Sequence, residues 1–254
     1  MPFTLAHPAA VLLVRGTPLP VSAMIAGSMA PDAPMFVKAR GAYDFTHSLA
    51  GVFTVDLALS VVGVALWFAL IRDPLLDLMP AVVRERMPAT ARYTRRQWLL
   101  VAPAAVVGSL THVAWDSFTH NGRWGARHVT WLHQLHHGHS GAEWAQYGCS
   151  VVGLLIVAAW AFVWVGRQQR IPRPATVRWL GVRALTVVLV LTITSGLAAA
   201  LTTGPPGIGP ALGQAAVVGT IIGVFAILVV AGLWQAHVRR RRSPGRPSPP
   251  PTRL

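Results

Sequence analysis

The chain has 254 residues, of which 53% are hydrophobic and only 12% are charged. A soluble domain of this size usually carries about 25% charged residues, so the composition excludes an ordinary soluble protein and indicates an integral membrane protein. The 22 basic residues outnumber the 8 acidic ones and give a net charge of +14. Because Arg residues flank the apolar runs, this excess indicates membrane orientation, and no nucleic-acid partner is expected.

Apolar runs of about 20 residues, the length that spans a bilayer, recur along the chain. They predict an all-α, polytopic membrane protein with about five spanning helices, at residues 52–71, 97–118, 148–166, 179–201 and 211–234. The N-terminal stretch lacks the layout of a signal peptide, because Arg15, Pro18 and Pro20 interrupt it. We expect the first 50 residues to be re-entrant or interfacial.

Basic residues gather in alternate connections. Sixteen of them fall in 72–96, 167–178 and the C-terminal tail, against five on the other side. The positive-inside rule then places the C-terminus in the cytoplasm and the 119–147 loop on the outer side of a bacterial inner membrane. The lipid bilayer is the expected partner, and the sequence does not indicate the oligomeric state.

The stretch THVAWDSFTH, residues 111–120, places His112, Asp116 and His120 four residues apart. Residues at this spacing share one face of a helix. A charged Asp within a span costs on the order of 2.5–3.5 kcal/mol, so Asp116 needs a partner or a watery cavity. A single H-x-x-x-D pair is a weak motif, and taken alone it favours a structural His–Asp hydrogen bond over a metal site.

Three further donors precede this stretch: His7 in FTLAHP, Asp32 in the turn GSMAPD, and His47 just before the first span. The predicted topology brings His47 to the same outer membrane face as the THVAWDSFTH residues. Imidazole and carboxylate donors suit zinc or a similar divalent ion. A cluster of them at one membrane face favours a metal site over a purely structural pair.

Two features leave alternatives open. The loop 119–147 is rich in His, and His139 with Glu143 forms a second pair at helical spacing, as a metal ligand pair or as part of a polar surface loop. Asp56 lies four residues into the first span. It either accepts a hydrogen bond from a ligand His or is an interface-level carboxylate.

The order of these donors resembles the ligand order of the zinc-dependent phospholipase C and single-strand nuclease superfamily. It is more similar still to membrane-bound relatives, the inner-membrane metal-dependent hydrolases. The segments PFTLAHPAA, GSMAPD, THS and THVAWDSFTH, followed by QYGCSVVGL, also resemble an uncharacterised bacterial membrane family of unknown function. The resemblance covers about the first 155 residues. The N-terminal Trp ligand of the soluble enzymes is absent, and the interval from His120 to His139 is long.

The resemblance implies a divalent metal cofactor, zinc or alternatively manganese, and a role for each donor. It assigns the main ion to His47, His112 and Asp116, and a second ion to His7, which shares Asp116. It assigns a third ion to His120, His139 and Glu143, and makes Asp32 the bridging or base-like catalytic carboxylate. The implied organisation is a metal-site membrane domain (1–155), additional spanning helices (156–238) and a disordered Arg- and Pro-rich tail (239–254).

The resulting hypothesis is a membrane-embedded, metal-dependent hydrolase of a phosphoric ester, such as a lipid phosphodiester. The alternatives are a non-catalytic metal-binding protein for transport, sensing or scaffolding, and a structural protein in which the His–Asp pairs only hold helices together. The last three predicted spans contain no His or carboxylate that would line an ion path, which argues against transport.

Overall fold

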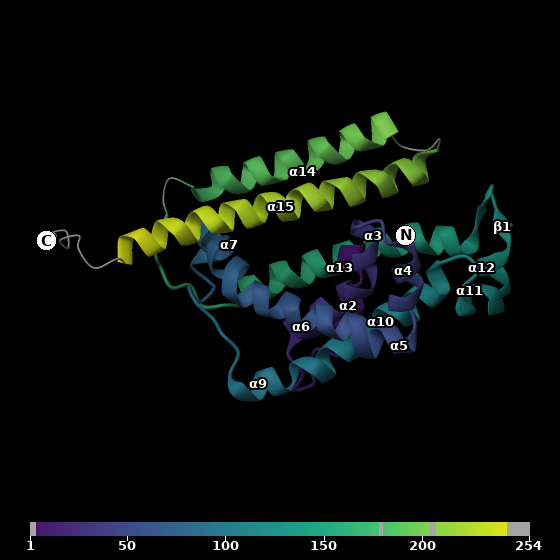
Figure 1. The fold of residues 1–254 in the computed structure, drawn as a ribbon, viewed down its shortest axis with the longest axis horizontal. Coiled ribbons are helices and arrows are strands. Elements are labelled where there is room, and N and C mark those ends of the chain that lie inside the picture. The colour runs from purple at the N-terminus through teal and green to yellow at the C-terminus, as the bar shows by residue number, and fades with distance from the viewer. Residues whose placement is uncertain (1–3, 178–179, 204–206, 243–254) are drawn as a thin grey trace, which may run out of the picture.

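A computed structural model describes residues 4–177, 180–203 and 207–242. These residues form an almost wholly helical structure with a single short β-hairpin, which confirms the predicted all-α fold (Figure 1). The 3-10 turns are η1 and η2, and η3 and η4 are π-helical. In chain order the elements are η1 (Thr4–Ala6), α1 (Pro8–Val11), α2 (Val21–Met29), η2 (Ala30–Asp32), α3 (Ala33–Phe36), α4 (Arg40–Thr46), α5 (Leu49–Gly51), η3 (Val52–Asp56), α6 (Leu57–Leu66), η4 (Trp67–Ile71), α7 (Arg72–Leu78), α8 (Ala81–Arg84), α9 (Arg95–Leu99), α10 (Val101–Thr119), α11 (Trp124–His128), α12 (Thr130–His133), β1 (Leu135–His136), β2 (His139–Ser140), α13 (Gly141–Gly166), α14 (Gly181–Thr203) and α15 (Ile208–Arg242).

Four helical stretches of the described chain are long and apolar enough to cross a membrane. They are Leu49–Leu78, Gly141–Gly166, Gly181–Thr202 and Gly209–Arg241. The expected span at 97–118 is not among them and is divided into α9 and α10. Ser109, His112 and Asp116 of α10 are buried, so this face of α10 points into the protein interior.

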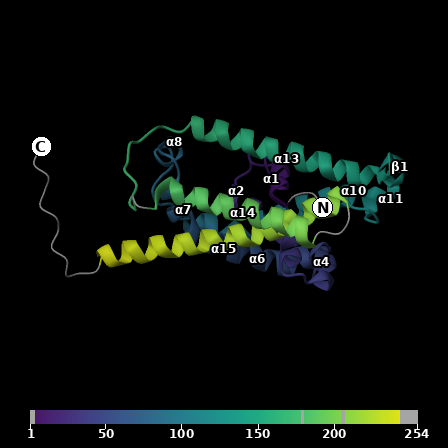
Figure 2. The same cartoon turned by 90° about the horizontal axis from the view of Figure 1, so that it is seen from above.

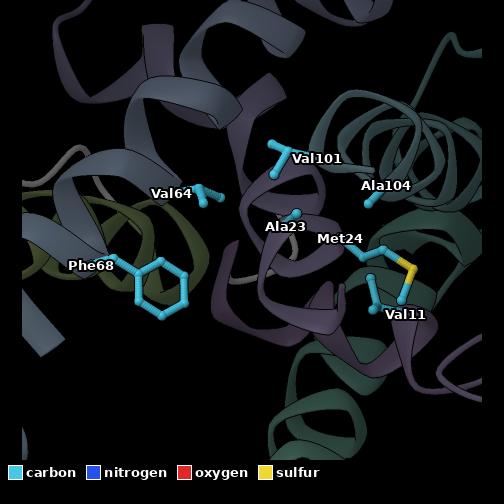
Figure 3. Close-up of a cluster of buried hydrophobic side chains, with 7 residues drawn as sticks. All are labelled: Val11, Ala23, Met24, Val64, Phe68, Val101 and Ala104. Carbon is cyan, nitrogen blue, oxygen red and sulfur yellow. The ribbon is translucent and has the colours of Figure 1, made fainter. Parts of the chain in front are cut away.

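The first 50 residues form short helices packed among the long ones. The longest, α2, has nine residues and is only about 14 Å long, well short of the roughly 30 Å of a bilayer core. It packs against both α6 and α10. The apolar centre of the fold lies at this junction and consists of Val11, Ala23, Met24, Val64, Phe68, Val101 and Ala104 (Figure 3).

Two glycines allow α2 and α10 to cross closely. A Cβ atom on Gly27 would collide with the backbone of Ala105, and one on Gly108 would collide with the Met24 carbonyl. Small residues let helix backbones approach in this way in membrane proteins. The Ser109 hydroxyl then donates to the Gly27 carbonyl at 3.0 Å. This crossing brings the C-terminal half of α10 against the end of α2.

The last two spans, α14 and α15, pack on each other and join the rest of the fold through α7 and η4. Figure 2 shows α13 and α15 on opposite sides of α1 and α2. At one end of the molecule, Asp77 accepts hydrogen bonds from the backbone amides of Thr176 and Val177 and from the Trp234 indole. The basic connections that follow α7 and α13 therefore meet the C-terminal part of α15 at that end.

Candidate metal centre

Four buried donors converge from three parts of the chain. Asp32 is the last residue of η2, and His47 is the C-cap of α4, while His112 and Asp116 lie one turn apart on α10. One ligand atom from each lies within 4.8 Å of the others. The four side chains are at most 2% exposed. The cluster lies where α4 and α5 meet the end of α10 that leads into α11 (Figure 1).

The spacing of the donors fits one divalent ion. His47 Nε2 and His112 Nε2 are 3.2 Å apart, and each lies 3.4 Å from Asp116 Oδ2. Asp32 Oδ1 lies 3.6 Å from His112 Nε2 and 3.9 Å from His47 Nε2. Four tetrahedral ligands at about 2.0–2.1 Å from zinc lie about 3.3–3.4 Å from one another. Two carboxylates and two neutral imidazoles also balance a charge of +2.

Backbone carbonyls fix the tautomers of both histidines. His47 Nδ1 donates to the Tyr43 carbonyl at 2.8 Å, and His112 Nδ1 donates to the Ser28 carbonyl at 2.7 Å. A carbonyl only accepts, so both neutral rings present their Nε2 lone pairs to each other and to Asp116. Such facing acceptors require a shared proton or a metal cation, and near-tetrahedral spacing favours the metal. Metal-binding histidines typically donate their other ring N–H to a carbonyl in this way.

Two threonines hold the carboxylate side of the cluster. Thr4 Oγ1 donates to Asp32 Oδ2 at 2.6 Å, which leaves Asp32 Oδ1 facing the histidines. Thr46 Oγ1 donates to the Pro31 carbonyl at 2.7 Å and ties the end of α4 to the turn that carries Asp32. Both hydroxyls fix ligands that arrive from separate short elements.

His7 and His120 contact Asp116 from outside this group of four. His7 Nε2 lies 3.5 Å from Asp116 Oδ1, and its ring stacks on that of His112 with centroids 3.8 Å apart. His120 ends α10, but its Nδ1 still lies 3.3 Å from Asp116 Oδ2. Among the described residues, neither ring nitrogen of His7 nor Nε2 of His120 has a hydrogen-bond partner. Each ring thus has one nitrogen close to Asp116, and each has at least one nitrogen without a partner among the described residues.

Burial sets the protonation of the outer donors. It lowers the pKa of His7 to about 3 and that of His120 to about 4, against the raising effect of Asp116. Both imidazoles are therefore neutral at pH 7, the form that can bind a metal. Burial also raises the pKa of Asp32, an effect that the Thr4 hydrogen bond opposes.

His139 and Glu143 are not among the four buried donors. Their side chains are exposed to 51% and 37%, and they lie 3.5 Å from each other. Glu143 accepts the backbone N–H of Ser140 in a capping box at the start of α13. In the described chain these two residues form a surface pair at the hairpin, not part of the four-donor group.

Asp56 is fully buried at the end of π-helical η3. Neither of its carboxylate oxygens has a hydrogen-bond partner in the described part of the protein, so it does not orient a ligand His. Short π-helical stretches are frequent at functional sites.

Sequence reasoning missed Tyr43. Its ring packs on the His47 ring with centroids 4.1 Å apart, its carbonyl orients His47, and its hydroxyl is buried without a partner among the described residues. Its position four residues before His47 is a weak sequence indication, because only the folded α4 brings this carbonyl to the imidazole.

A comparison with models of protein families places the chain in a family. A family model described as a domain of unknown function, DUF4184, matches residues 1–236. The chain belongs to the DUF4184 family. The predicted resemblance to an uncharacterised family is thereby confirmed, and in this DUF4184 protein the match continues through α14 and most of α15. No curated protein and no solved structure matches the chain.

Proposed function

We propose that this DUF4184 protein is a membrane-embedded hydrolase of a phosphoric ester that depends on a divalent metal ion. The observation that carries the proposal is the pair of Nε2 atoms 3.2 Å apart, both made acceptors by backbone carbonyls and both beside two buried carboxylates. An apolar or purely structural cluster has no need of four converging acceptors. The N and O donor set favours zinc, with manganese as the alternative.

The donors divide into two groups around Asp116. His47, His112 and Asp116 would hold the main ion, and Asp32 beside it would be the catalytic base. His7 and His120 would hold a second ion that shares Asp116, because His7 Nε2 lies 3.5 Å from Asp116 Oδ1 and His120 Nδ1 lies 3.3 Å from Asp116 Oδ2. The resemblance also assigned His120 to a third ion with His139 and Glu143. The exposure of those two side chains, 51% and 37%, favours the smaller, two-group arrangement.

The chemistry follows from these positions. A bound divalent ion supplies a Lewis acid that polarises the phosphoryl oxygen and lowers the pKa of bound water to about 7. Asp32 Oδ1 accepts the proton of the attacking water, while Thr4 holds the other carboxylate oxygen in place. The oxygen of that water bonds to phosphorus, and the bond to the leaving oxygen breaks. Burial excludes bulk water and strengthens each electrostatic contact.

The substrate and location follow from the arrangement of the long helices. The cluster and the basic connections lie at opposite ends of the molecule. By the positive-inside rule the basic end is cytoplasmic, in a bacterial inner membrane, and the metal centre is near the outer surface. A lipid headgroup at that surface reaches the centre without leaving the bilayer, which favours a lipid phosphodiester.

Hydrolysis by purified protein tests the proposal. We expect detergent-purified protein loaded with zinc or manganese to hydrolyse phospholipids or generic phosphodiesters. Asp32→Asn should reduce the rate about 100-fold or more, the usual range for loss of a general base. Glu143→Gln is the matched control, because Glu143 is 37% exposed and is not one of the four buried donors. Absence of hydrolysis with either metal, or an unchanged rate in Asp32→Asn, contradicts the proposal.

The second candidate is a metal-binding protein without catalysis. The near-complete burial of Asp32, His47, His112 and Asp116 favours it, because structural metal sites are closed whereas catalytic sites keep an open position. It predicts bound metal that exchanges slowly, and no hydrolysis. The hydrolysis assay therefore separates the two candidates.

A further inference from the structure

Among the donors that the structure describes, only His120 leaves the metal centre partly exposed to solvent. Five of the six donor side chains around Asp116 are at most 2% exposed, whereas His120 is 18% exposed. The chain leaves α10 at His120 and turns through Gly122, whose φ of +79° favours glycine. Arg123 follows, and its backbone amide donates to the His120 carbonyl at 3.2 Å. A ligand that reaches the donors from solvent therefore passes His120 and Arg123.

Arg123 lies at this edge without a buried partner. Its guanidinium lies 5.8 Å from the centre of the Tyr43 ring, and its side chain is 29% exposed. The carboxylate that pairs with it, Asp44 at 3.2 Å, is 83% exposed. Ion pairs at such exposed positions are weak. Arg123 can therefore exchange Asp44 for an incoming anion at little cost.

Tyr43 connects Arg123 to the donors. Its ring contacts both the Arg123 guanidinium, which lies 5.8 Å from the ring centre, and the His47 imidazole, whose centroid lies 4.1 Å away. Its hydroxyl is buried and has no partner in the described part of the chain. Buried Tyr hydroxyls usually find a hydrogen-bond partner.

We propose that Tyr43 and Arg123 bind a tetrahedral phosphate oxyanion at the His120 edge of the metal centre. The Arg123 guanidinium pairs with two phosphate oxygens, as its planar fork allows, and the Tyr43 hydroxyl donates to a third. This inference rests on the proposed function and names its anion-binding residues. A lipid headgroup and a free phosphate ester both present this group.

Binding of inorganic phosphate to the metal-loaded, full-length protein tests the pair. Calorimetry in detergent, with zinc content measured on the same samples, gives affinity and occupancy together. We expect Tyr43→Phe and Arg123→Gln each to weaken phosphate binding about 10-fold or more, since each removes a hydrogen bond to a charged group. Zinc content should stay at the wild-type level, because Tyr43→Phe keeps the ring and the carbonyl that orient His47.

Arg127→Gln is the matched control. Arg127 lies one turn further along α11 and is exposed, so its loss should change phosphate affinity less than about 2-fold. A parallel titration with short-chain phosphatidylglycerol identifies the source of the anion. Tighter binding of the lipid than of phosphate assigns a headgroup, and equal or weaker binding assigns a free ester; both results support the anion site.

Unchanged phosphate affinity in Tyr43→Phe and Arg123→Gln, with full zinc content, overturns the inference and leaves the metal centre standing. Absence of phosphate binding by the zinc-loaded wild type has the same meaning. A wild-type protein that binds no zinc overturns the proposed function and the anion site together. The zinc measurement therefore distinguishes the two failures.

Discussion

At the scale of single residues, the metal centre depends on which nitrogen of each histidine carries the proton. The carbonyls of Tyr43 and Ser28 accept hydrogen bonds from Nδ1–H of His47 and His112. The Nε2 lone pairs of both rings then face the carboxylates. Spacing in the sequence predicted that His112 and Asp116 share a helix face. It gave no indication of the two carbonyls, because these come from residues 4 and 84 positions away in the chain.

The pH dependence of stability tests the buried state of His7. Its pKa is about 3 in the folded protein and about 6.5 when unfolded. The unfolded state therefore binds more protons below pH 6.5. Stability from this group is present above pH 6.5 and is lost as the pH falls from 6.5 towards 3, by about 1.4 kcal/mol per unit.

Thermal melting of chelator-treated protein between pH 8 and pH 4.5 measures this loss. We expect the melting temperature of His7→Asn to fall less steeply with decreasing pH than that of the wild type. The control, His128→Asn, removes an exposed His of α11 and should follow the wild type. Parallel curves for His7→Asn and wild type would show that His7 does not titrate as a buried, neutral group.

At the scale of elements, the crossing of α2 and α10 positions the centre. Gly27 and Gly108 remove the side chains that would separate the two helices. The His112 ring can then reach the Ser28 carbonyl at the end of α2, and Asp32 follows in the next turn. The sequence predicted a spanning helix at 97–118, because apolar periodicity cannot tell a lipid-facing helix from one buried among short helices.

Gly108→Ala tests this crossing. The added methyl group meets the Met24 backbone, which cannot rotate away, so α10 must shift. Overpacking of this kind costs about 1–3 kcal/mol. We expect a lower melting temperature and reduced metal content, because the His112–Ser28 hydrogen bond is displaced.

Gly63→Ala is its control. Gly63 lies within α6, and a Cβ atom there meets nothing within 4 Å. Since Ala is favoured over Gly inside helices by about 0.5–1 kcal/mol, this variant should be neutral or slightly stabilised. Equal metal content and stability in Gly108→Ala and Gly63→Ala would mean that the close crossing does not position the centre.

At the scale of the whole molecule, the Arg-rich connections and the metal centre lie towards opposite ends of the long helices. Arg84 and Arg173 bond to each other's backbone carbonyls, and Glu85 pairs with Arg170, at the end where Asp77 joins α7 to α15. The metal centre and the His-rich hairpin lie at the other end (Figure 1). Counting basic residues predicted this division, because it depends on the order of the connections and not on contacts.

Labelling of single cysteines tests which end faces the cytoplasm. In a Cys149→Ser background, Leu135→Cys reports on the hairpin and Val82→Cys on α8, since both positions are exposed. We expect a membrane-impermeant maleimide to label Leu135→Cys, but not Val82→Cys, in spheroplasts, in which the inner membrane is intact and its outer face is accessible. Labelling of Val82→Cys alone would reverse the proposed orientation.

The metal content of the purified protein tests the centre most directly. Elemental analysis would compare wild type with His112→Ala/Asp116→Ala, and with His128→Ala/His133→Ala as a control for adventitious binding by the exposed histidines. We predict at least one zinc or manganese ion per chain in the wild type and in the control, and loss of that ion in His112→Ala/Asp116→Ala. No metal in the wild type after reconstitution, or loss of metal only in the control, would contradict a buried metal centre at Asp32, His47, His112 and Asp116.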